Sequence, residues 1–242
     1  GNWQWVDPMG GQRPRLLETV DYGLGALTTL SYSTSVQDYL RDLKGTEFDW
    51  NSEPLAPGSA TAKCDAKAQA RGAGCVHRGG GSPVVSTVVR AVSTTDRMSA
   101  LGVADQVSRT EYKYHDAYYE GIEQEFRGFG AAEAVVLGDD HGPTSITRTY
   151  FHQGRRPNAI AADRLANNPN EALKGREYLT ETYDEGGNYL SSSHATYAVR
   201  SLGTGLDGKD ISYAYVKRSD ELKYDSSSAS AGSSGKLTFE SV

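Results

Sequence analysis

The stretch from residue 107 to residue 137 constrains the fold more than any other part of this 242-residue chain. Its first half has the two-residue period of a strand, with two faces: Glu111, Lys113 and His115 on one, Tyr112 and Tyr114 on the other. Glu120 and Gly121 interrupt this pattern, and residues 122–137 continue as a second long strand. The stretch therefore predicts a long antiparallel β-hairpin.

Two glycines in the returning strand predict an irregular ladder. Gly128 and Gly130 have no side chain to pack, which is typical of a bulge or of a close backbone approach. Phe126 and Phe129 differ in parity, so both can pack on one face only if a bulge lies near Gly128. We expect these two rings to anchor the hairpin to the neighbouring strand pair. Arg127 is expected to bridge to a carboxylate or to backbone carbonyls.

The whole chain is predicted to be mainly β, built of long antiparallel hairpins with two short helices. Runs rich in β-branched residues and tyrosine predict further strands at residues 16–20, 26–32, 83–92, 144–152, 177–184, 193–202, 211–216 and 237–242. Capping residues predict helices between residues 35 and 45 and between residues 168 and 175. Residues 51–82 and 226–235 are rich in small residues and predict mobile loops.

The charge balance excludes one class of partner. The chain has 25 Lys and Arg residues against 31 Asp and Glu residues, a net charge of −6 with His neutral. Nucleic-acid binding needs a basic stripe, so no nucleic-acid partner is expected.

Cys64 and Cys75 stand at the two ends of a segment without an apolar residue larger than Ala. A disulfide that closes such a loop stabilises a fold by about 3 kcal/mol, and we expect one here. Two free thiols remain the alternative, and a metal site is disfavoured because no His pair lies nearby. A disulfide would favour an exported protein.

The sequence holds acid–base residues but no pattern typical of catalysis or metal binding. Glu123 and Glu125 could serve a hydrolase, yet their spacing favours a solvated or salt-bridged ladder that Arg127 continues. His115 and His152 fall within strand patterns, without the spacing of metal ligands. We therefore expect no catalytic residue, no metal and no cofactor.

Aromatic residues allow a different class of function. A carbohydrate platform could be formed by Tyr118, Tyr119, Phe126, Phe129, Tyr150 and Phe151. Packing between stacked hairpins is the interpretation that we favour. An extracellular carbohydrate-binding or adhesion module stays as the alternative function.

The hairpin also carries a long and unusual motif. Its residues are, in order, Tyr112, Tyr114, His115, Asp116, Tyr118, Tyr119, Gly121, Ile122, Glu123, Glu125, Phe126, Arg127, Gly128, Phe129 and Gly130. They resemble the signature Y-x-Y-H-x-G-Y-[YF]-D-G-x-E-R-E-F-R-G-F-G. That signature belongs to the middle region of insecticidal toxin-complex (Tc) B components and SpvB-like proteins, in the Rhs/YD-repeat toxin superfamily. Ala117 and Gln124 depart from it, standing where the family has Gly and Arg.

Shorter motifs resemble the same family in the same order. They are residues 16–26 (L-L-x-x-V-D-N-G-L-G-A, with Tyr22 for Asn), 39–42 (Y-L-x-D), 149–154 (T-W-[FY]-H-T-G) and 171–176 (E-A-L-R-G-R). Tyr183, Asp184, Gly187 and Asn188 fit a single YD repeat, Y-D-x-x-G-N. The resemblance covers residues 13–202.

This resemblance implies both a fold and a function. In the family, hairpins spiral into a hollow shell around a toxin, so residues 13–242 would be a fragment of a curved β-sheet shell. Residues 1–12 would follow an upstream domain such as a β-propeller. The implied role is a non-catalytic wall that encapsulates a toxin or effector in a secreted, extracellular protein. The motif residues would then have a structural role. The implied partners are the propeller upstream, the Rhs core downstream, the enclosed cargo and a pore-forming translocation subunit.

Overall fold

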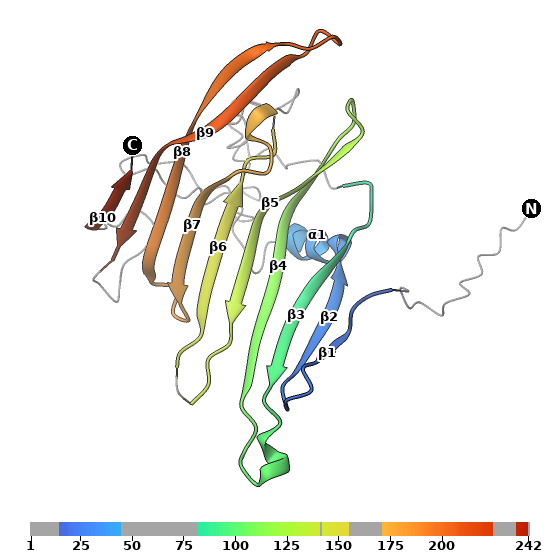
Figure 1. The fold of residues 1–242 in the computed structure, drawn as a ribbon, viewed down its shortest axis with the longest axis vertical. Helices are drawn as coiled ribbons and strands as arrows, with labels where there is room; N and C mark the ends of the chain where they lie inside the picture. The colour runs from blue at the N-terminus through green and yellow to red at the C-terminus, as the bar shows by residue number, and fades with distance from the viewer. Residues whose placement is uncertain (1–14, 45–81, 141, 155–170, 225–235, 242) are drawn as a thin grey trace, which may run out of the picture.

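A computed structural model describes residues 15–44, 82–140, 142–154, 171–224 and 236–241 (Figure 1). Ten strands form one antiparallel sheet in which each strand pairs with its neighbours in chain order. They are β1 Thr19–Asp21, β2 Leu27–Thr34, β3 Thr87–Thr95, β4 Val107–Glu120, β5 Glu125–Val136, β6 Ser145–Phe151, β7 Glu177–Asp184, β8 Tyr189–Thr204, β9 Asp210–Lys223 and β10 Lys236–Ser241. This mainly β, hairpin-built architecture confirms the predicted fold class.

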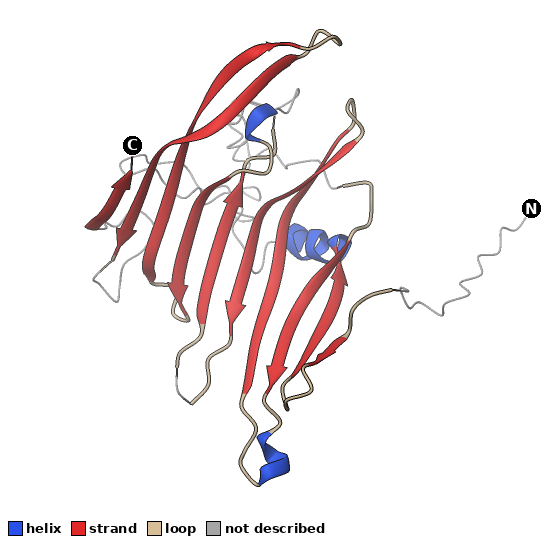
Figure 2. Cartoon of the chain, in the orientation of Figure 1, coloured by secondary structure: helices blue, strands red, loops and turns tan. Residues whose placement is uncertain are grey.

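Helices are short and few beside the strands in the described part of the chain (Figure 2). The helix α1 Ser35–Lys44 follows β2 directly and lies against β4. Its start is fixed to the chain before β3, because the Ser35 hydroxyl accepts a hydrogen bond from the Ser86 amide at 3.0 Å. No helix among the described residues is long and apolar enough to cross a membrane.

The second predicted helix is shorter than expected. Only a 3-10 turn, Glu171–Leu173, is present in the described part of residues 168–175, and Gly175 follows it with φ of +75°. A further 3-10 turn, Met98–Leu101, connects β3 to β4 and carries none of the sequence signals used above. Cys64, Cys75 and both predicted mobile loops, apart from Ser82, lie outside the described residues.

Several strands differ in length from their predictions. β9 runs on to Lys223 because its charged second half pairs with β8 and β10, a tertiary contact without a hydrophobic pattern. β8 begins at Tyr189 rather than at residue 193, and β3 begins at Thr87 rather than at residue 83. β1 spans only Thr19–Asp21, whereas the prediction was residues 16–20.

The β4–β5 hairpin contains the bulge expected near Gly128. The register shifts between Ala117 and Tyr119, and Gly128 has φ of +79°. The shift brings Phe126 and Phe129 together, with ring centroids 5.7 Å apart and edge to face. Phe129 also lies 4.9 Å from the ring of Tyr114 on β4. These ring contacts lie within the hairpin, so anchoring to the neighbouring strand pair stays a prediction.

The two faces of the sheet have different chemistry. The face against α1 carries buried apolar residues, of which Ala131, Tyr150 and Leu179 form one cluster. The opposite face of β6, β7 and β8 presents half-buried hydroxyls from Thr147, Thr149, Thr180, Thr182, Ser191 and Ser193. The ends of β8 and β9 project beyond β6 and β7 (Figure 1), and this arm exposes Leu202, Leu206, Ile211 and Tyr213.

Candidate functional site

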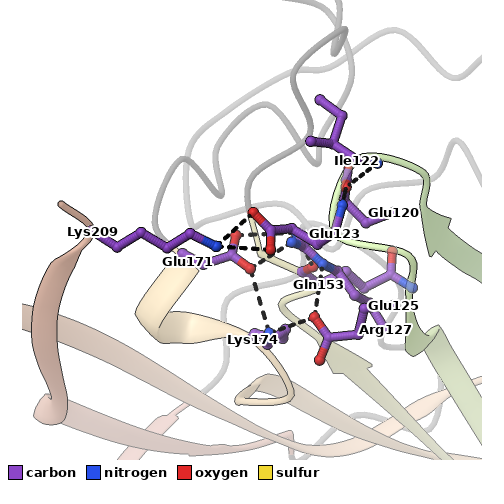
Figure 3. A network of polar contacts seen from close by, with 9 residues as sticks. All are labelled: Glu120, Ile122, Glu123, Glu125, Arg127, Gln153, Glu171, Lys174 and Lys209. Carbon is purple, nitrogen blue, oxygen red and sulfur yellow. Dashed lines mark hydrogen bonds and ion pairs between the residues drawn. The ribbon is translucent and has the colours of Figure 1, made fainter. Parts of the chain in front are cut away.

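Motif residues from three distant segments meet beside the β4–β5 turn (Figure 3). We call this group the Arg127 cluster, and its members are Glu125, Arg127, Gln153, Gly154, Glu171 and Lys174. Glu125 and Arg127 lie on β5, Gln153 and Gly154 follow β6, and the other two belong to the turn before β7. The sequence motifs are thus neighbours in space although up to 49 positions separate them.

Arg127 is the centre of this cluster. Its side chain is only 2% exposed, and its Nη2 lies 2.6 Å from Oε1 of Glu171. Its Nη1 donates to Oε2 of Glu171 at 3.1 Å and to the carbonyl of Gln153 at 3.4 Å. The planar guanidinium therefore makes the two-pronged contact with a carboxylate that Lys could not reproduce. Both a carboxylate and a backbone carbonyl are partners of Arg127, as the sequence indicated.

Gln153 fixes the hairpin bulge to this cluster. Its side chain is fully buried, and its Nε2 donates to the carbonyls of Asp116 at 2.8 Å and Gly128 at 3.1 Å. Asp116 and Gly128 are both in the left-handed region, with φ of 52° and 79°, one on each side of the bulge. Gln153 was missed in the sequence because it does not match the motif T-W-[FY]-H-T-G, which has Thr between His152 and Gly154.

The acidic residues near the turn have separate basic partners. Glu123 pairs with Lys209 of the β8–β9 turn at 2.9 Å, and Glu125 pairs with Lys174 at 2.7 Å. The hydrogen bond from Lys174 holds the pKa of Glu125 below its ordinary value. A general acid in a hydrolase needs a raised pKa, so this geometry favours the salt-bridged interpretation.

Glu120 closes the same turn. It is 5% exposed, and its Oε2 accepts hydrogen bonds from the amides of Ile122 at 2.8 Å and Glu123 at 2.7 Å. Gly121 begins the turn in open space, since a Cβ there would meet nothing within 4 Å. Gly130 is different, because a Cβ there would lie 2.7 Å from Oδ2 of Asp116.

A second group, which we call the polar ladder, crosses the sheet on the face of α1. Its members, in spatial order, are Asp42 of α1, His115, Glu133, Arg148, Glu181, Tyr183 and Tyr189. Glu133, Arg148, Glu181 and Ser192 are direct cross-strand partners from β5 to β8. Opposite charges thus alternate across three neighbouring strands, which stabilises this register over its alternatives.

His115 joins α1 to the ladder. Its Nδ1 lies 2.9 Å from Oδ1 of Asp42, and its Nε2 lies 3.9 Å from Oε2 of Glu133. Burial lowers the pKa of His115, but the two carboxylates outweigh burial and the pKa is raised above 6.5. Burial raises the pKa of Glu133, yet His115 and Arg148 together lower it to about 2. Both shifts favour the charged forms of these groups.

The contacts of the YD-repeat residues show why the motif has these residue types. The Asp184 carboxylate accepts hydrogen bonds from the amide of Asn188 at 2.8 Å and from its side chain at 2.9 Å. Gly187 has φ of +80°, a conformation that favours glycine in this tight turn. Tyr183 is buried, and its hydroxyl donates to Oε2 of Glu181 at 2.5 Å. The repeat therefore closes the β7–β8 hairpin and attaches it to the polar ladder.

The aromatic residues considered as a carbohydrate platform do not share one environment. Tyr150 is 2% exposed and belongs to the apolar cluster. Tyr119 pairs with Phe126 across the hairpin, next to the Phe129 ring. The other motif tyrosines are half-buried on β4: Tyr112, Tyr114 and Tyr118. Phe151 is half-buried at the end of β6.

The histidines in the described part of the chain are packed groups. His152 stacks on Tyr178 with ring centroids 4.5 Å apart, and burial lowers its pKa to about 4. Within the described residues, no group of three or more His, Cys, Asp or Glu side chains could hold a metal ion. His141, between Asp140 and Gly142, lies outside those residues.

The described strands form an antiparallel meander of hairpins with ion pairs between them, and comparison with known proteins identifies the class of protein to which this sheet belongs. The family described as "Insecticide toxin TcdB middle/N-terminal region" matches residues 9–157, more than half of the chain. The chain belongs to this family, as the resemblance in the sequence indicated. A search of curated proteins gave no match.

Solved structures share the fold. Those of TcdB2-TccC3-TEV and of the Photorhabdus luminescens Tc holotoxin pore each have a TM-score of 0.61 and 18% identity, covering 87% of this chain and 10% of theirs. The structure of TcdB2-TccC3-Cdc42 has the same TM-score of 0.61 and identity of 18%, covering 87% of this chain and 11% of its own. The chain therefore spans about a tenth of the length of the solved chains that it matches.

Proposed function

We propose that this chain is a non-catalytic wall segment of a Tc toxin B component, where its sheet forms part of a hollow shell around a toxin or effector polypeptide. The observation that carries the proposal is the strand order. The ten strands of the described part of the chain pair only with their neighbours in sequence, so the sheet grows sideways one strand at a time. Further hairpins can extend such a sheet from either edge, as the wall of a large shell requires.

The motif residues support this role because they join hairpins to one another. Arg127 and Gln153 connect the bulge of β4 and β5 to the chain after β6. Asp184 closes the turn between β7 and β8. Catalysis requires acid and base groups with matched pKa values around one reacting centre, whereas these groups are occupied by structural partners.

The solved relatives suggest which partners to test. Their structures contain TcdB2 together with TccC3, and one contains the Tc holotoxin pore. We propose that the full-length protein assembles with a TccC-like chain that supplies the enclosed polypeptide. The remaining shell, with a propeller upstream and an Rhs core downstream, and a pore-forming subunit complete the secreted assembly.

Protease protection of the enclosed polypeptide tests the proposal. In the full-length assembled complex, Arg127→Ala should weaken the wall and increase the rate at which protease digests the cargo. The matched control is Arg218→Ala, because Arg218 is partly exposed and pairs at 2.8 Å with Asp220 on its own strand. Intact assemblies that protect the cargo equally well in both variants and in the unsubstituted protein would contradict a wall function.

Two further measurements test the other classes of function. A glycan array probed with the chain would detect the alternative carbohydrate-binding function. Any hydrolytic activity that Glu125→Gln abolishes would contradict the non-catalytic proposal.

A further inference from the structure

The contact between α1 and the sheet depends on a buried imidazole between two carboxylates. The side chain of His115 is 0% exposed, with Asp42 of α1 on one side and Glu133 of β5 on the other. Asp42 is 11% exposed and Glu133 is 5% exposed, so water screens neither partner strongly. Another polar contact between α1 and the sheet is the hydrogen bond that Arg41 donates to the carbonyl of Tyr114 at 3.4 Å.

We propose that His115 is a pH-dependent latch that holds α1 against β4 and β5 while protonated and releases the end of α1 near Asp42 when it loses its proton. An imidazolium has two N–H donors and a positive charge, so Nδ1 can donate to Asp42 at 2.9 Å while Nε2 faces Glu133 in a longer ion pair at 3.9 Å. Neutral imidazole has one donor, so one ring nitrogen would then present a lone pair to a carboxylate. The neutral ring also removes the positive charge that faces Asp42 from the sheet. The other basic partner of Asp42, Nη2 of Arg41 at 3.7 Å, lies on α1 itself, so the attraction between α1 and the sheet weakens.

The other charged groups around His115 do not replace this titration near neutral pH. They are Asp38, Arg41 and Asp42 on α1, Arg90 on β3, Lys113 on β4, Glu133 on β5 and Arg148 on β6. Arginine keeps its charge throughout the range in which proteins fold, and lysine ordinarily loses its proton only near pH 10. Burial raises the pKa of Asp38, while the pKa of Glu133 is lowered to about 2. Of His115 and these surrounding groups, the histidine is therefore the side chain that ordinarily titrates near neutrality.

The direction of the effect follows from the sign of the shift. The native pKa of His115 is raised above its ordinary value of 6.5 by Asp42 and Glu133, against the effect of burial. The stabilisation is therefore complete below pH 6.5 and is lost as the pH rises through the native pKa. The start of α1 should stay in place, because it is held by the hydrogen bond between the Ser86 amide and the Ser35 hydroxyl at 3.0 Å, and this contact does not titrate.

Hydrogen exchange of the full-length protein between pH 6 and pH 9 tests the latch. Exchange is measured on peptides covering Ser35–Lys44 and is normalised at each pH to the rate of an unstructured peptide. We expect the protection of this segment to fall with rising pH, by up to about tenfold for each unit by which the native pKa exceeds the unfolded one. Peptides from β6 and β7 should keep their protection.

Substitutions separate the latch from general alkaline loosening. His115→Gln cannot titrate and should make the protection of α1 independent of pH, and Asp42→Asn should do so in part. Asp42→Asn also serves if His115→Gln fails to fold. The matched control is His152→Gln, which removes another buried histidine, and it should leave the pH dependence of α1 unchanged.

Two results would overturn the latch. One is protection of α1 that does not change between pH 6 and pH 9 in the unsubstituted protein. The other is an equal pH dependence in the unsubstituted protein and in the Asp42→Asn and His115→Gln variants that fold. Neither measurement involves the enclosed polypeptide, so the result is independent of the proposed wall function.

Discussion

At the scale of single residues, Gly154 is the position where the Arg127 cluster leaves least room. Its φ is +80°, and a Cβ there would lie 2.8 Å from Nη1 of Arg127 and 3.0 Å from Oε2 of Glu171. We expect Gly154→Ala to lower the free energy of unfolding by about 1–3 kcal/mol from backbone strain alone, and by more once the contact is included. Urea denaturation of the variant measures the change.

Gly208→Ala is the matched control for this substitution. Gly208 has a similar φ of +77°, but a Cβ there would meet nothing within 4 Å. In Gly208→Ala the free energy of unfolding should fall only by the cost of backbone strain. An equal fall in both variants would show that the Arg127 cluster tolerates a methyl group.

Tyr183 is the second residue that the structure singles out. Its hydroxyl donates to Glu181 at 2.5 Å, and Glu181 is only 4% exposed. Tyr183→Phe should therefore destabilise the fold by about 1–3 kcal/mol, the range for a buried acceptor that loses its donor. Tyr189→Phe removes a hydroxyl 3.2 Å from that of Tyr183 and should have a smaller effect. A larger loss for Tyr189→Phe, measured by the same denaturation, would contradict the assigned donor.

At the scale of elements, the β4–β5 hairpin depends on its aromatic contacts. Phe129 contacts the rings of both Tyr114 and Phe126, whereas among the described aromatic residues Phe126 has a ring contact with Phe129 alone. Both phenylalanines are half-buried, so each Ala substitution should cost less than the about 3–5 kcal/mol of a fully buried Phe. Phe129→Ala should have the larger effect on the melting temperature. The reverse order would contradict this description of the hairpin.

The junction between β6 and β7 should respond to acid. Burial holds the pKa of His152 at about 4, below the ordinary 6.5, so the native state keeps the ring neutral. Stability from this group is complete above pH 6.5 and is lost as the pH falls toward 4, because the unfolded chain takes up the proton first. His152→Phe should reduce the slope of unfolding free energy against pH in this window. An unchanged slope would show that His152 is accessible to protons in the folded protein.

At the scale of the whole molecule, the described sheet has open edges. β10 pairs with β9 only over Ser219–Lys223, so residues 210–218 of β9 have β8 as their one strand neighbour among the described elements. Ile211 and Tyr213 on this stretch are 51% and 56% exposed. An exposed apolar edge is a template for pairing with another chain, so the isolated chain should self-associate.

Sedimentation velocity over a range of concentrations measures this association. Tyr213→Lys places a charge on the open edge and should reduce it. The control is Tyr22→Lys, because Tyr22 is 58% exposed but lies in the turn between β1 and β2. A chain that stays monomeric at every concentration would contradict the expectation of an incomplete sheet.

The sequence by itself determined the local structure. The two-residue period around His115, the interruption at Gly121 and the parity conflict between Phe126 and Phe129 predicted a hairpin with a bulge near Gly128. The Asp184–Asn188 turn followed in the same way from residue chemistry. All of these depend on neighbours a few positions apart, so the pattern of side chains was sufficient to predict them.

Tertiary structure alone decided which distant residues meet. Glu133, Arg148 and Glu181 give no local signal, and they become partners only because the register of three strands sets them side by side. Gln153 reaches the carbonyls of Asp116 and Gly128 only after the bulge has turned them toward it. A shift of one residue in any of these strands would turn such side chains to the opposite face, so their contacts are properties of the assembled sheet.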